Sequence, residues 1–372
     1  MAHNVGSDQF ERIVNILNFF KGILSFNLSQ KLNEKFRKFL VLIPALMGII
    51  CVLCSVMGSI GSDGDVVIFA FATILVISVS QVAVKIVSLF LYEVRIDKIL
   101  QWFRSLYCTD ENDINSQIFT NNLRKTEKIV DLVVRIFLYS FGLSLIILLF
   151  HINMGHKLFL ILPFIPKEYF LLHTIGGTIL LLYNIISLII TECTMMLIGI
   201  YFIGALSILS EIIKKLNESS NIPSAGKLLR SIITLHIEIL TNFNEFCDIF
   251  YFIFTIQLFT SVLLLLGIFY LLLQTMAVLF VSIVGSIYCQ FTLFCIFGQI
   301  IRGKSERIFT DLYQTKWYEM SIKDQKALLI IMRMSQKGFE LRACGMYDID
   351  FMMLVNVSKM CFSYCTILYA LL

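Results

Sequence analysis

Residues 169–209 read YFLLHTIGGTILLLYNIISLIITECTMMLIGIYFIGALSIL, and Glu192 is the single charged side chain among them. A helix needs about 20 mostly apolar residues to cross a bilayer core about 30 Å thick. As one helix this stretch would be about 60 Å long, at about 1.5 Å per residue. We therefore expect a membrane helix that continues past the bilayer on one side, where its apolar surface must pack on protein.

The composition of the whole chain agrees with this interpretation. Of its 372 residues 58% are hydrophobic and only 15% are charged, and the mean hydropathy is +0.84. Average soluble domains carry about 25% charged residues, so an ordinary soluble protein is excluded. The net charge of +4 comes from basic residues scattered among acids, a pattern that does not predict nucleic-acid binding.

Six further apolar stretches complete a prediction of seven membrane helices. The predicted spans are 39–60, 66–92, 129–151, 169–209, 243–273, 275–301 and 347–372. The span 243–273 is also longer than a bilayer needs, and we expect it to continue beyond the membrane as well. The predicted fold class is an all-α membrane protein.

Basic residues indicate how these helices are oriented. Of the 30 Lys and Arg residues, 25 lie in the segments 1–38, 93–128, 210–242 and 302–346, whereas only two lie in 152–168. Because Lys and Arg accumulate in cytoplasmic loops, we expect a cytoplasmic N-terminus and, after seven spans, an extracellular C-terminus. This polarity is the inverse of that of a G-protein-coupled receptor. The ten cysteines then lie in spans or cytoplasmic loops and predict no disulfide framework.

Four regions follow from these spans. Residues 1–38 form a cytoplasmic amphipathic segment that lies along the inner leaflet or packs under the helices. Residues 39–301 hold six membrane helices with cytoplasmic extensions, residues 302–346 form cytoplasmic anchor helices, and residues 347–372 form the last membrane helix. The apolar side of the first segment is formed by Phe10, Ile13, Ile16, Leu17, Phe20 and Leu24.

The five histidines form no metal-binding motif, and the sequence contains no phosphate-binding glycine loop and no Gly-x-Ser-x-Gly nucleophile motif. We therefore predict that the chain is not an enzyme and holds no cofactor or metal. Cys51 and Cys54 are interpreted as packing residues, and His151 and His173 as residues of the membrane interface. Glu192 is expected to bond between helices rather than to conduct ions. Lys85 and Arg135 lie near span ends, where their side chains are expected to reach the interface.

The last predicted helix carries polar residues on one side. At about 100° per residue, Asn356, Lys359 and Ser363 share that side with Met360, Ala370 and the apolar pair Ile367 and Leu371. Polar side chains are costly in lipid, so this side should meet water or protein. Around a symmetry axis it would line a conduit, and Ile367 and Leu371 would form a hydrophobic gate. A helix interface joined by polar contacts explains the pattern equally well.

The C-terminal part of the sequence resembles that of insect odorant receptors. The residues that carry the resemblance are Phe297-Gly298, Lys304-Ser305-Glu306, Tyr313, Trp317-Tyr318, Lys326, Leu328, Arg333, Ser335-Gln336, Gly345, Lys359 and Ser363-Tyr364. Leu162-Pro163-Phe164 and His236 resemble the family more loosely. The related gustatory receptors end in a Thr-Tyr and Gln-Phe pattern that this sequence lacks.

This resemblance implies an odorant-gated, non-selective cation channel in a sensory neuron's plasma membrane. The family assembles as a tetramer with the odorant receptor co-receptor, and its last helices line one pore with the gate at Ile367 and Leu371. The co-receptor carries Gln where this chain has Ala370, which implies a ligand-tuned subunit. The partners would be the co-receptor, a small volatile ligand, lipid and permeant cations.

The resemblance also implies a ligand site in the outer half of the membrane, among the second to sixth spans. Candidate residues at that depth are Phe69, Phe71, Ser144, Ile147, His151, Thr178, Leu182, Phe269 and Met276. Apolar residues at helical spacing are also what any buried helix shows, so core packing competes with ligand contact for each. A metabotropic seven-helix chemoreceptor, a gustatory-type channel, and a transporter or structural subunit without its own pore remain as alternatives.

Overall fold

The computed structural model describes Glu11, Asn15 and the ranges 42–60, 66–107, 116–155, 160–163, 165–166, 168–217, 225–275 and 278–371. The amphipathic segment predicted at residues 1–38 otherwise lies outside the described residues. The helices are α3 (Leu42–Ile60), α4 (Val66–Leu91), α5 (Glu93–Tyr107), α6 (Ser116–Gly155), α7 (Phe170–Lys215), α8 (Ala225–Thr275), α9 (Val278–Tyr313), η2 (Trp317–Glu319), α10 (Ile322–Ser335) and α11 (Phe351–Leu371). Two short strands, β1 (Arg342–Ala343) and β2 (Tyr347–Asp348), precede α11.

Helices occupy all seven ranges that were predicted as membrane spans. Within the described residues, five of them are long and apolar enough to cross a membrane, namely those in α4, α6, α7, α8 and α9. The described parts of α3 and α11 are shorter apolar helices. That these two helices also cross the bilayer, and which terminus faces the cytoplasm, stay predictions.

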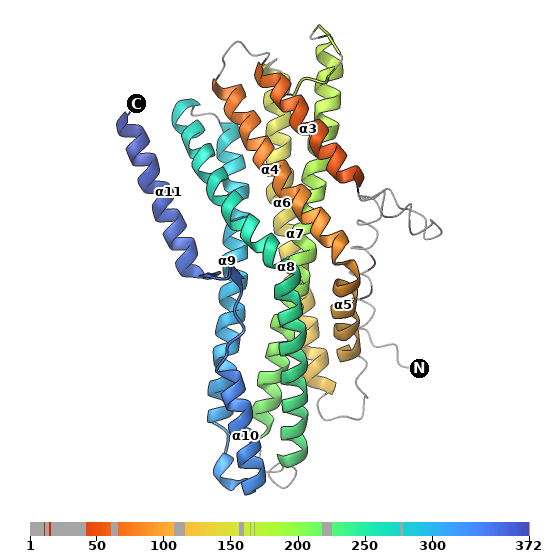
Figure 1. Cartoon of the computed structure of the whole chain (residues 1–372), viewed down its shortest axis with the longest axis vertical. Coiled ribbons are helices and arrows are strands. Elements are labelled where there is room, and N and C mark those ends of the chain that lie inside the picture. Colours follow the sequence, from red (N-terminus) through yellow and green to blue (C-terminus); the bar gives the residue numbers. More distant parts are fainter. Residues whose placement is uncertain are drawn as a thin grey trace.

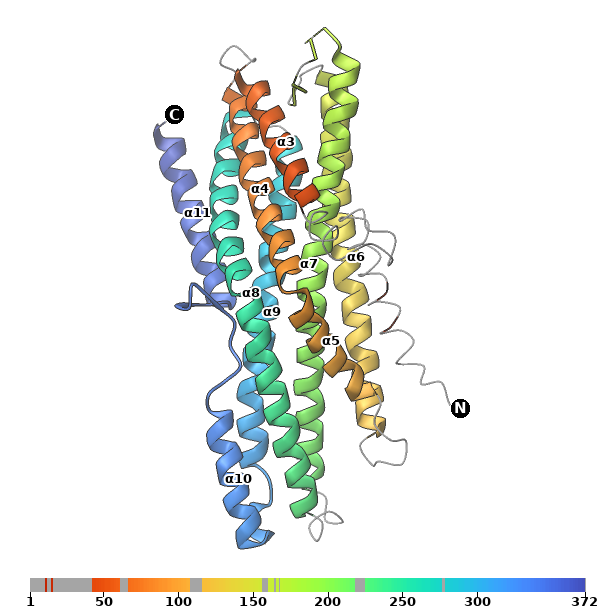
Figure 2. The same ribbon diagram turned by 45° about the vertical axis from the view of Figure 1, so that its right-hand side comes forward.

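Four long helices, α6 to α9, form the frame of the molecule (Figure 1). Helices α3, α4 and α11 lie beside one end of this frame, and α5 and α10 lie beside the other (Figures 1 and 2). From Phe170 onward the stretch 169–209 forms one continuous helix, as predicted from its length, and α7 continues to Lys215. α6 begins at Ser116, well before the predicted span at 129.

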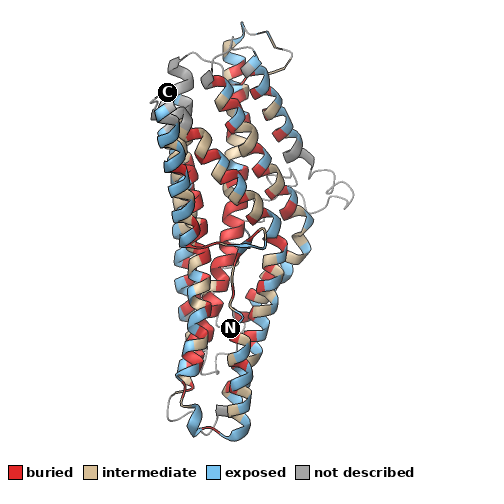
Figure 3. Ribbon diagram, turned by 60° about the vertical axis from the view of Figure 1, so that its left-hand side comes forward, coloured by how far each residue is buried: buried red, intermediate tan, exposed pale blue. Residues whose placement is uncertain are grey.

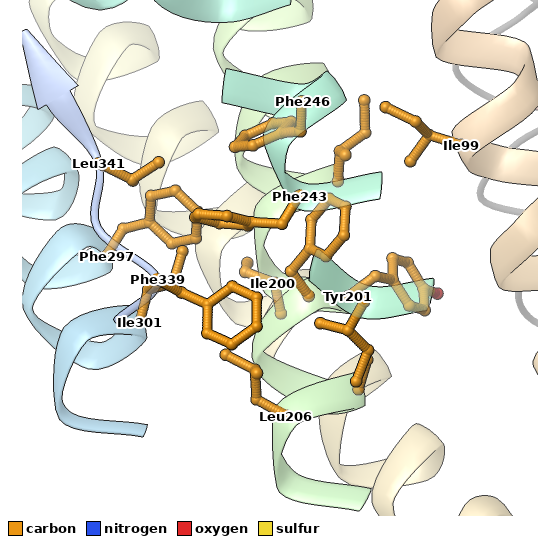
Figure 4. Close-up of a cluster of buried hydrophobic side chains, with 14 of the residues drawn as sticks. Ile99, Ile200, Tyr201, Leu206, Phe243, Phe246, Phe297, Ile301, Phe339 and Leu341 are labelled. Atoms are coloured by element: carbon orange, nitrogen blue, oxygen red, sulfur yellow. The ribbon is translucent and has the colours of Figure 1, made fainter. Parts of the chain in front are cut away.

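The buried core runs along α7 toward the end of the frame where α5 and α10 lie (Figure 3). Every residue from Ile190 to Phe202 is buried, as the apolar character of an over-long helix requires. Phe202 contacts Phe243 and Phe246 of α8 with ring centroids 5.5 and 5.4 Å apart. Figure 4 shows Phe339, Ile301 and Phe297 approaching the same cluster from the C-terminal part of the chain. Aromatic packing therefore joins segments that are far apart in sequence.

The predicted anchor segment 302–346 is only partly helical. Its second helix is present as α10, where the hydroxyl of Ser321 accepts a hydrogen bond from the amide of Asp324 at 3.2 Å and caps the N-terminus. Leu328 and Ile331 are buried, and Ala327 and Met332 pack against the core partly buried, so four of the six residues in the apolar run 327–332 pack on the protein. Leu329 and Ile330 on the other side of α10 stay exposed.

A small hairpin, which the sequence did not predict, connects α10 to α11. Arg342 pairs with Asp348 and Ala343 with Tyr347, and Cys344 and Gly345 adopt positive φ at the turn. The hydrogen bond from Arg342 to Glu340 raises the pKa of the arginine above its ordinary value. The hairpin sets where the last helix begins.

The start of α11 is fixed against α9. A Cβ on Gly298 would lie 1.9 Å from the carbonyl oxygen of Ile349, so the two backbones are in direct contact. Asp350 caps α11 by accepting a hydrogen bond from the amide of Met353 at 2.9 Å. Arg302 of α9 donates to the other carboxylate oxygen of Asp350 at 3.2 Å. α9 therefore determines the position of the N-terminus of α11.

Candidate functional site

A cavity of about 120 Å³ lies among α4, α6, α7, α8 and α9. Most of its wall is aliphatic or aromatic, as is typical of sites for small organic ligands. Its lining residues are Phe71, Ile74, Leu75, Ser78, Val79, Gln81, Phe141, Ser144, Leu145, Leu181, Asn184, Ile185, Leu188, Leu264, Ile283, Ser286, Ile287 and Gln290. These five helices are the ones predicted as the second to sixth spans.

Two of the predicted ligand residues, Phe71 and Ser144, line this cavity. The other described candidates lie outside its lining, namely Phe69, Ile147, Thr178, Leu182 and Phe269. Phe69 is 64% exposed on the surface of α4. The side chain of His151 and all of Met276 lie outside the described residues.

Ser144 takes part in a polar contact in the cavity wall. Its hydroxyl lies 2.5 Å from the hydroxyl of Ser286 on α9, and it donates to the carbonyl of Ser282 at 3.0 Å. Ser286 in turn donates to the carbonyl of Ser140 at 3.0 Å. The two serines therefore tie α6 to α9, and both of their hydroxyl groups are hydrogen-bonded.

The cavity meets a buried polar network at Gln81 of α4 and Gln290 of α9. Lys85 forms an ion pair with Glu192 of α7 and also donates to the side-chain oxygen of Gln257 on α8. The amide nitrogen of Gln81 donates to the same Gln257 oxygen at 2.5 Å, and that of Gln290 donates to Glu192 at 2.6 Å. Four helices thus share one network at the boundary of the apolar cavity.

The expectation that the side chain of Lys85 reaches the membrane interface is wrong. Lys85 and Glu192 are each only 1% exposed, and the lysine is oriented inward because its charge is neutralised by a carboxylate on another helix. Glu192 bonds between helices as expected. The second oxygen of this carboxylate, Oε2, is buried without a hydrogen-bond partner among the described residues. Arg135 is exposed, and it pairs with Asp131 one turn away at 2.7 Å.

Other sequence-predicted residues serve the structure. Cys51 and Cys54 are free, buried and packed in the apolar cluster around α3, and no metal-binding group of His, Cys, Asp or Glu occurs among the described residues.

His173 is buried rather than interfacial. It accepts a hydrogen bond from the amide of Leu162 at 3.0 Å, and its other ring nitrogen lies 3.1 Å from the carbonyl of Pro166. The histidine thereby holds the segment before α7.

The polar side of α11 is turned away from the rest of the chain. Met353 and Cys361 are buried on the opposite side of the helix, which packs on α8 and α9. Asn356, Lys359, Met360, Ser363, Ile367 and Ala370 are all exposed. The helix itself stands at the edge of the bundle (Figures 1 and 2). The side chain of Leu371 lies outside the described residues.

Asp348 and Asp350 already have partners within the chain. Arg342 donates to Asp348 at 3.1 Å, and Arg302 donates to Asp350 at 3.2 Å. A lysine in the last helix, such as Lys359, could pair with either aspartate of a neighbouring subunit, but these contacts within the chain disfavour such a pair. Among the described residues no side chain bonds to Lys359.

α9 touches both the cavity and α11. Ile287 lines the cavity, whereas the hydroxyl of the next residue, Tyr288, lies 3.2 Å from that of Ser358 on α11. On α8, Phe269 contacts Phe362 of α11 with ring centroids 6.2 Å apart. A displacement of the cavity wall can therefore reach α11 through one layer of helices.

Comparisons with known proteins agree with the sequence resemblance. The 7tm Odorant receptor family matches residues 65–362 of the chain. The fold is similar to that of the insect olfactory receptor OR5 from Machilis hrabei, with a TM-score of 0.80 and 13% identity over 97% of this chain and 99% of that one. The same receptor in complex with eugenol gives a TM-score of 0.77 at 13% identity, over 98% and 100% of the two chains. A search of curated proteins by sequence found no match.

Proposed function

Because the chain belongs to the 7tm odorant receptor family, a family of membrane receptors and not of enzymes, we propose that it is a subunit of an odorant-gated, non-selective cation channel. The ligand is a small volatile organic molecule that binds in the cavity among α4, α6, α7, α8 and α9. The cavity volume of about 120 Å³ is near that of the apolar cavity of about 150 Å³ that accepts benzene in another protein. The eugenol complex of the Machilis receptor supports a ligand of this kind.

The observation that carries the channel proposal is the exposed polar stripe of α11. A helix surrounded by lipid would not place Asn356, Lys359 and Ser363 in a row on its open side, and the rest of this chain leaves that side uncovered. Four such helices around an axis would form a pore, with Ile367 and Leu371 as a hydrophobic gate. Lys359 would add positive charge to the pore, so this subunit is expected to conduct cations only beside a partner that compensates it.

We propose that ligand binding is coupled to this gate through α9 and α8. A ligand shifts the equilibrium between closed and open channels only by the difference between its affinities for the two states. The cavity wall at Ile287 and the contact between Tyr288 and Ser358 lie on successive residues of α9. If α9 shifts to a position that binds the ligand more tightly, its contact with α11 changes as well.

The assembly that we propose is a heterotetramer with the odorant receptor co-receptor in the plasma membrane of a sensory neuron. The N-terminus is cytoplasmic, residues 39–301 hold the ligand site, residues 302–346 anchor the subunits, and residues 347–372 line the pore. The basic residues in 1–38, 93–128, 210–242 and 302–346 support this orientation.

Co-expression with the co-receptor tests the proposal. A panel of small volatile compounds should evoke cation currents, and Ile367→Ala or Leu371→Ala should change their amplitude, ion selectivity or basal level. Val355→Ala, an exposed substitution outside the polar stripe, is the matched control. Currents that neither gate substitution alters would exclude the assigned gate.

Topology separates the channel from a metabotropic receptor. An epitope tag at the N-terminus should be inaccessible to antibody in intact cells and accessible after permeabilisation. Labelling of intact cells would contradict the proposed orientation and would favour the metabotropic alternative.

A further inference from the structure

The boundary between the cavity and the buried network has a defined hydrogen-bonding polarity. A lysine ammonium group has donors only, so the atom of Gln257 that contacts Lys85 must be the amide oxygen. Gln81 contacts this same oxygen and must therefore present its amide nitrogen. The charge of Lys85 thus sets the orientation of both amides.

The same logic applies to Gln290 on the neighbouring wall. An ionised carboxylate only accepts hydrogen bonds, so Gln290 presents its nitrogen to Glu192. The amide nitrogen of each glutamine carries two N–H groups and donates one of them to the network. Each glutamine therefore keeps one N–H and its amide oxygen for another partner. Among the described residues, no group donates to either of these oxygens, and both glutamines line the cavity.

The boundary therefore offers two amide oxygens that only a hydrogen-bond donor can satisfy, and beside each of them an N–H group that only an acceptor can satisfy. Gln81 and Gln290 are almost completely buried, at 2% and 4% exposure, so bulk water does not satisfy their oxygens. A buried acceptor without a donor is unfavourable, and a partner that donates a hydrogen bond recovers that energy. A positively charged donor would be costly here, because it must lose its hydration close to the ammonium group of Lys85. A neutral group that both donates and accepts a hydrogen bond, as a hydroxyl does, fits best.

Resting on the proposed function, we propose that the ligand of this cavity carries a hydroxyl group, as an alcohol or a phenol does, and that this hydroxyl donates to the amide oxygen of Gln81 or Gln290. The apolar wall takes the hydrocarbon part of the molecule. Ethers of the same size lack the donor and leave both oxygens unpaired. Gln81 and Gln290 thus determine the specificity of the site.

Three isomers with the formula C7H8O test this proposal without changing the number of atoms. Benzyl alcohol and 4-methylphenol carry a hydroxyl group, whereas anisole is an ether. Their binding to the purified full-length chain is measured by ligand-observed nuclear magnetic resonance. At least one of the two hydroxyl compounds should bind about three- to ten-fold more tightly than anisole, as one buried hydrogen bond predicts.

Substitution of the two glutamines provides the second part of the binding experiment. Gln81→Met with Gln290→Met should bring the affinity ratio between hydroxyl compound and ether close to one. Leu264→Val, in the apolar wall, should change the affinities of both compounds to a similar extent and leave their ratio unchanged. Measuring the ratio on the unmodified chain keeps the test valid if the glutamine variant does not fold.

Equal affinity for all three isomers, or no binding of any of them at millimolar concentration, would overturn the inference. Neither result would remove the proposed channel function, which fails separately if no volatile compound in a broad panel evokes a current.

Discussion

Lys85 and Glu192 are two charged side chains that are almost completely buried, and this makes their pairing a condition of folding. Removing charge from water costs several kcal/mol per ion even after relaxation, of the order of 20 kcal/mol in the idealised case. The ion pair and the hydrogen bond that Gln290 donates to Glu192 offset part of this cost. Each charge is therefore tolerated only in the presence of the other.

Breaking this pair on one side should destabilise the protein severely. Lys85→Met leaves a buried carboxylate and Glu192→Leu leaves a buried ammonium group, and we expect a loss of about 3–5 kcal/mol for each. The double variant, Lys85→Met with Glu192→Leu, should be more stable than either single variant, because it removes both charges. Thermal unfolding of the purified protein and the amount at the cell surface measure the effect.

The exposed pair of Arg135 and Asp131 is the matched control. Its atoms are also at hydrogen-bond distance, 2.7 Å, but both side chains are more than half exposed. Surface pairs on one helix contribute about 0.3–0.5 kcal/mol, so Arg135→Met should have little effect. A double variant of the buried pair that is less stable than both single variants would show that the network has a larger role than charge neutralisation.

At the residue scale, the cavity proposed as the ligand site shows which of its residues a local sequence pattern can predict. Phe71 and Ser144 were predicted from their depth in the membrane, and both line the cavity. Phe69 was also predicted from depth, yet its side chain is on the opposite surface of the same helix. Lys85 was misinterpreted because its partner lies 107 positions away in the sequence, and no pattern within one helix indicates such a pairing.

At the scale of elements, the junction between α9 and α11 depends on the absence of a side chain at Gly298. An alanine there would put its Cβ 1.9 Å from the carbonyl oxygen of Ile349, which is backbone and cannot rotate away. The segment that starts α11 would have to move, although the rest of the protein could fold around the change.

We expect Gly298→Ala to alter gating more than ligand binding. The basal current and the maximal response should change, because the last helix is displaced at its first turn. Gly303→Ala on the same helix has no atom within 4 Å of the new Cβ, and it should be neutral or stabilising by up to about 1 kcal/mol. Equal gating in both variants and the unmodified chain would argue against control of α11 by α9.

Regular elements could be predicted where their apolar residues are continuous. All seven apolar stretches are helices, because each satisfies its backbone hydrogen bonds internally, as lipid requires. The first turns of α6 and the whole of α5 were missed as helices, since their charged residues read as a loop. The hairpin before α11 has strands of only two residues. Strands this short contain too few residues to show the alternation of apolar and polar side chains by which a strand is predicted.

At the scale of the whole molecule, the half that contains α10 keeps apolar side chains at its surface. Leu329 and Ile330 are 68% and 63% exposed on the side of α10 that faces away from the chain, and Tyr318 and Ile322 nearby are exposed as well. Outside a membrane, an apolar patch of this kind marks a protein interface. The proposed anchor between subunits is the interface that fits it.

A charge in this patch should therefore weaken assembly without unfolding the subunit. We expect Leu329→Glu or Ile330→Glu to reduce the fraction of the proposed tetramer by about ten-fold or more, because each would place a carboxylate in the proposed subunit contact. Light scattering or native mass spectrometry of the detergent-solubilised complex measures the subunit number. Gln101→Glu adds the same charge at an exposed site on α5 and should leave assembly unchanged. If the Leu329 and Ile330 variants assemble as fully as the control, the patch lies outside the subunit contact and another surface must hold the tetramer together.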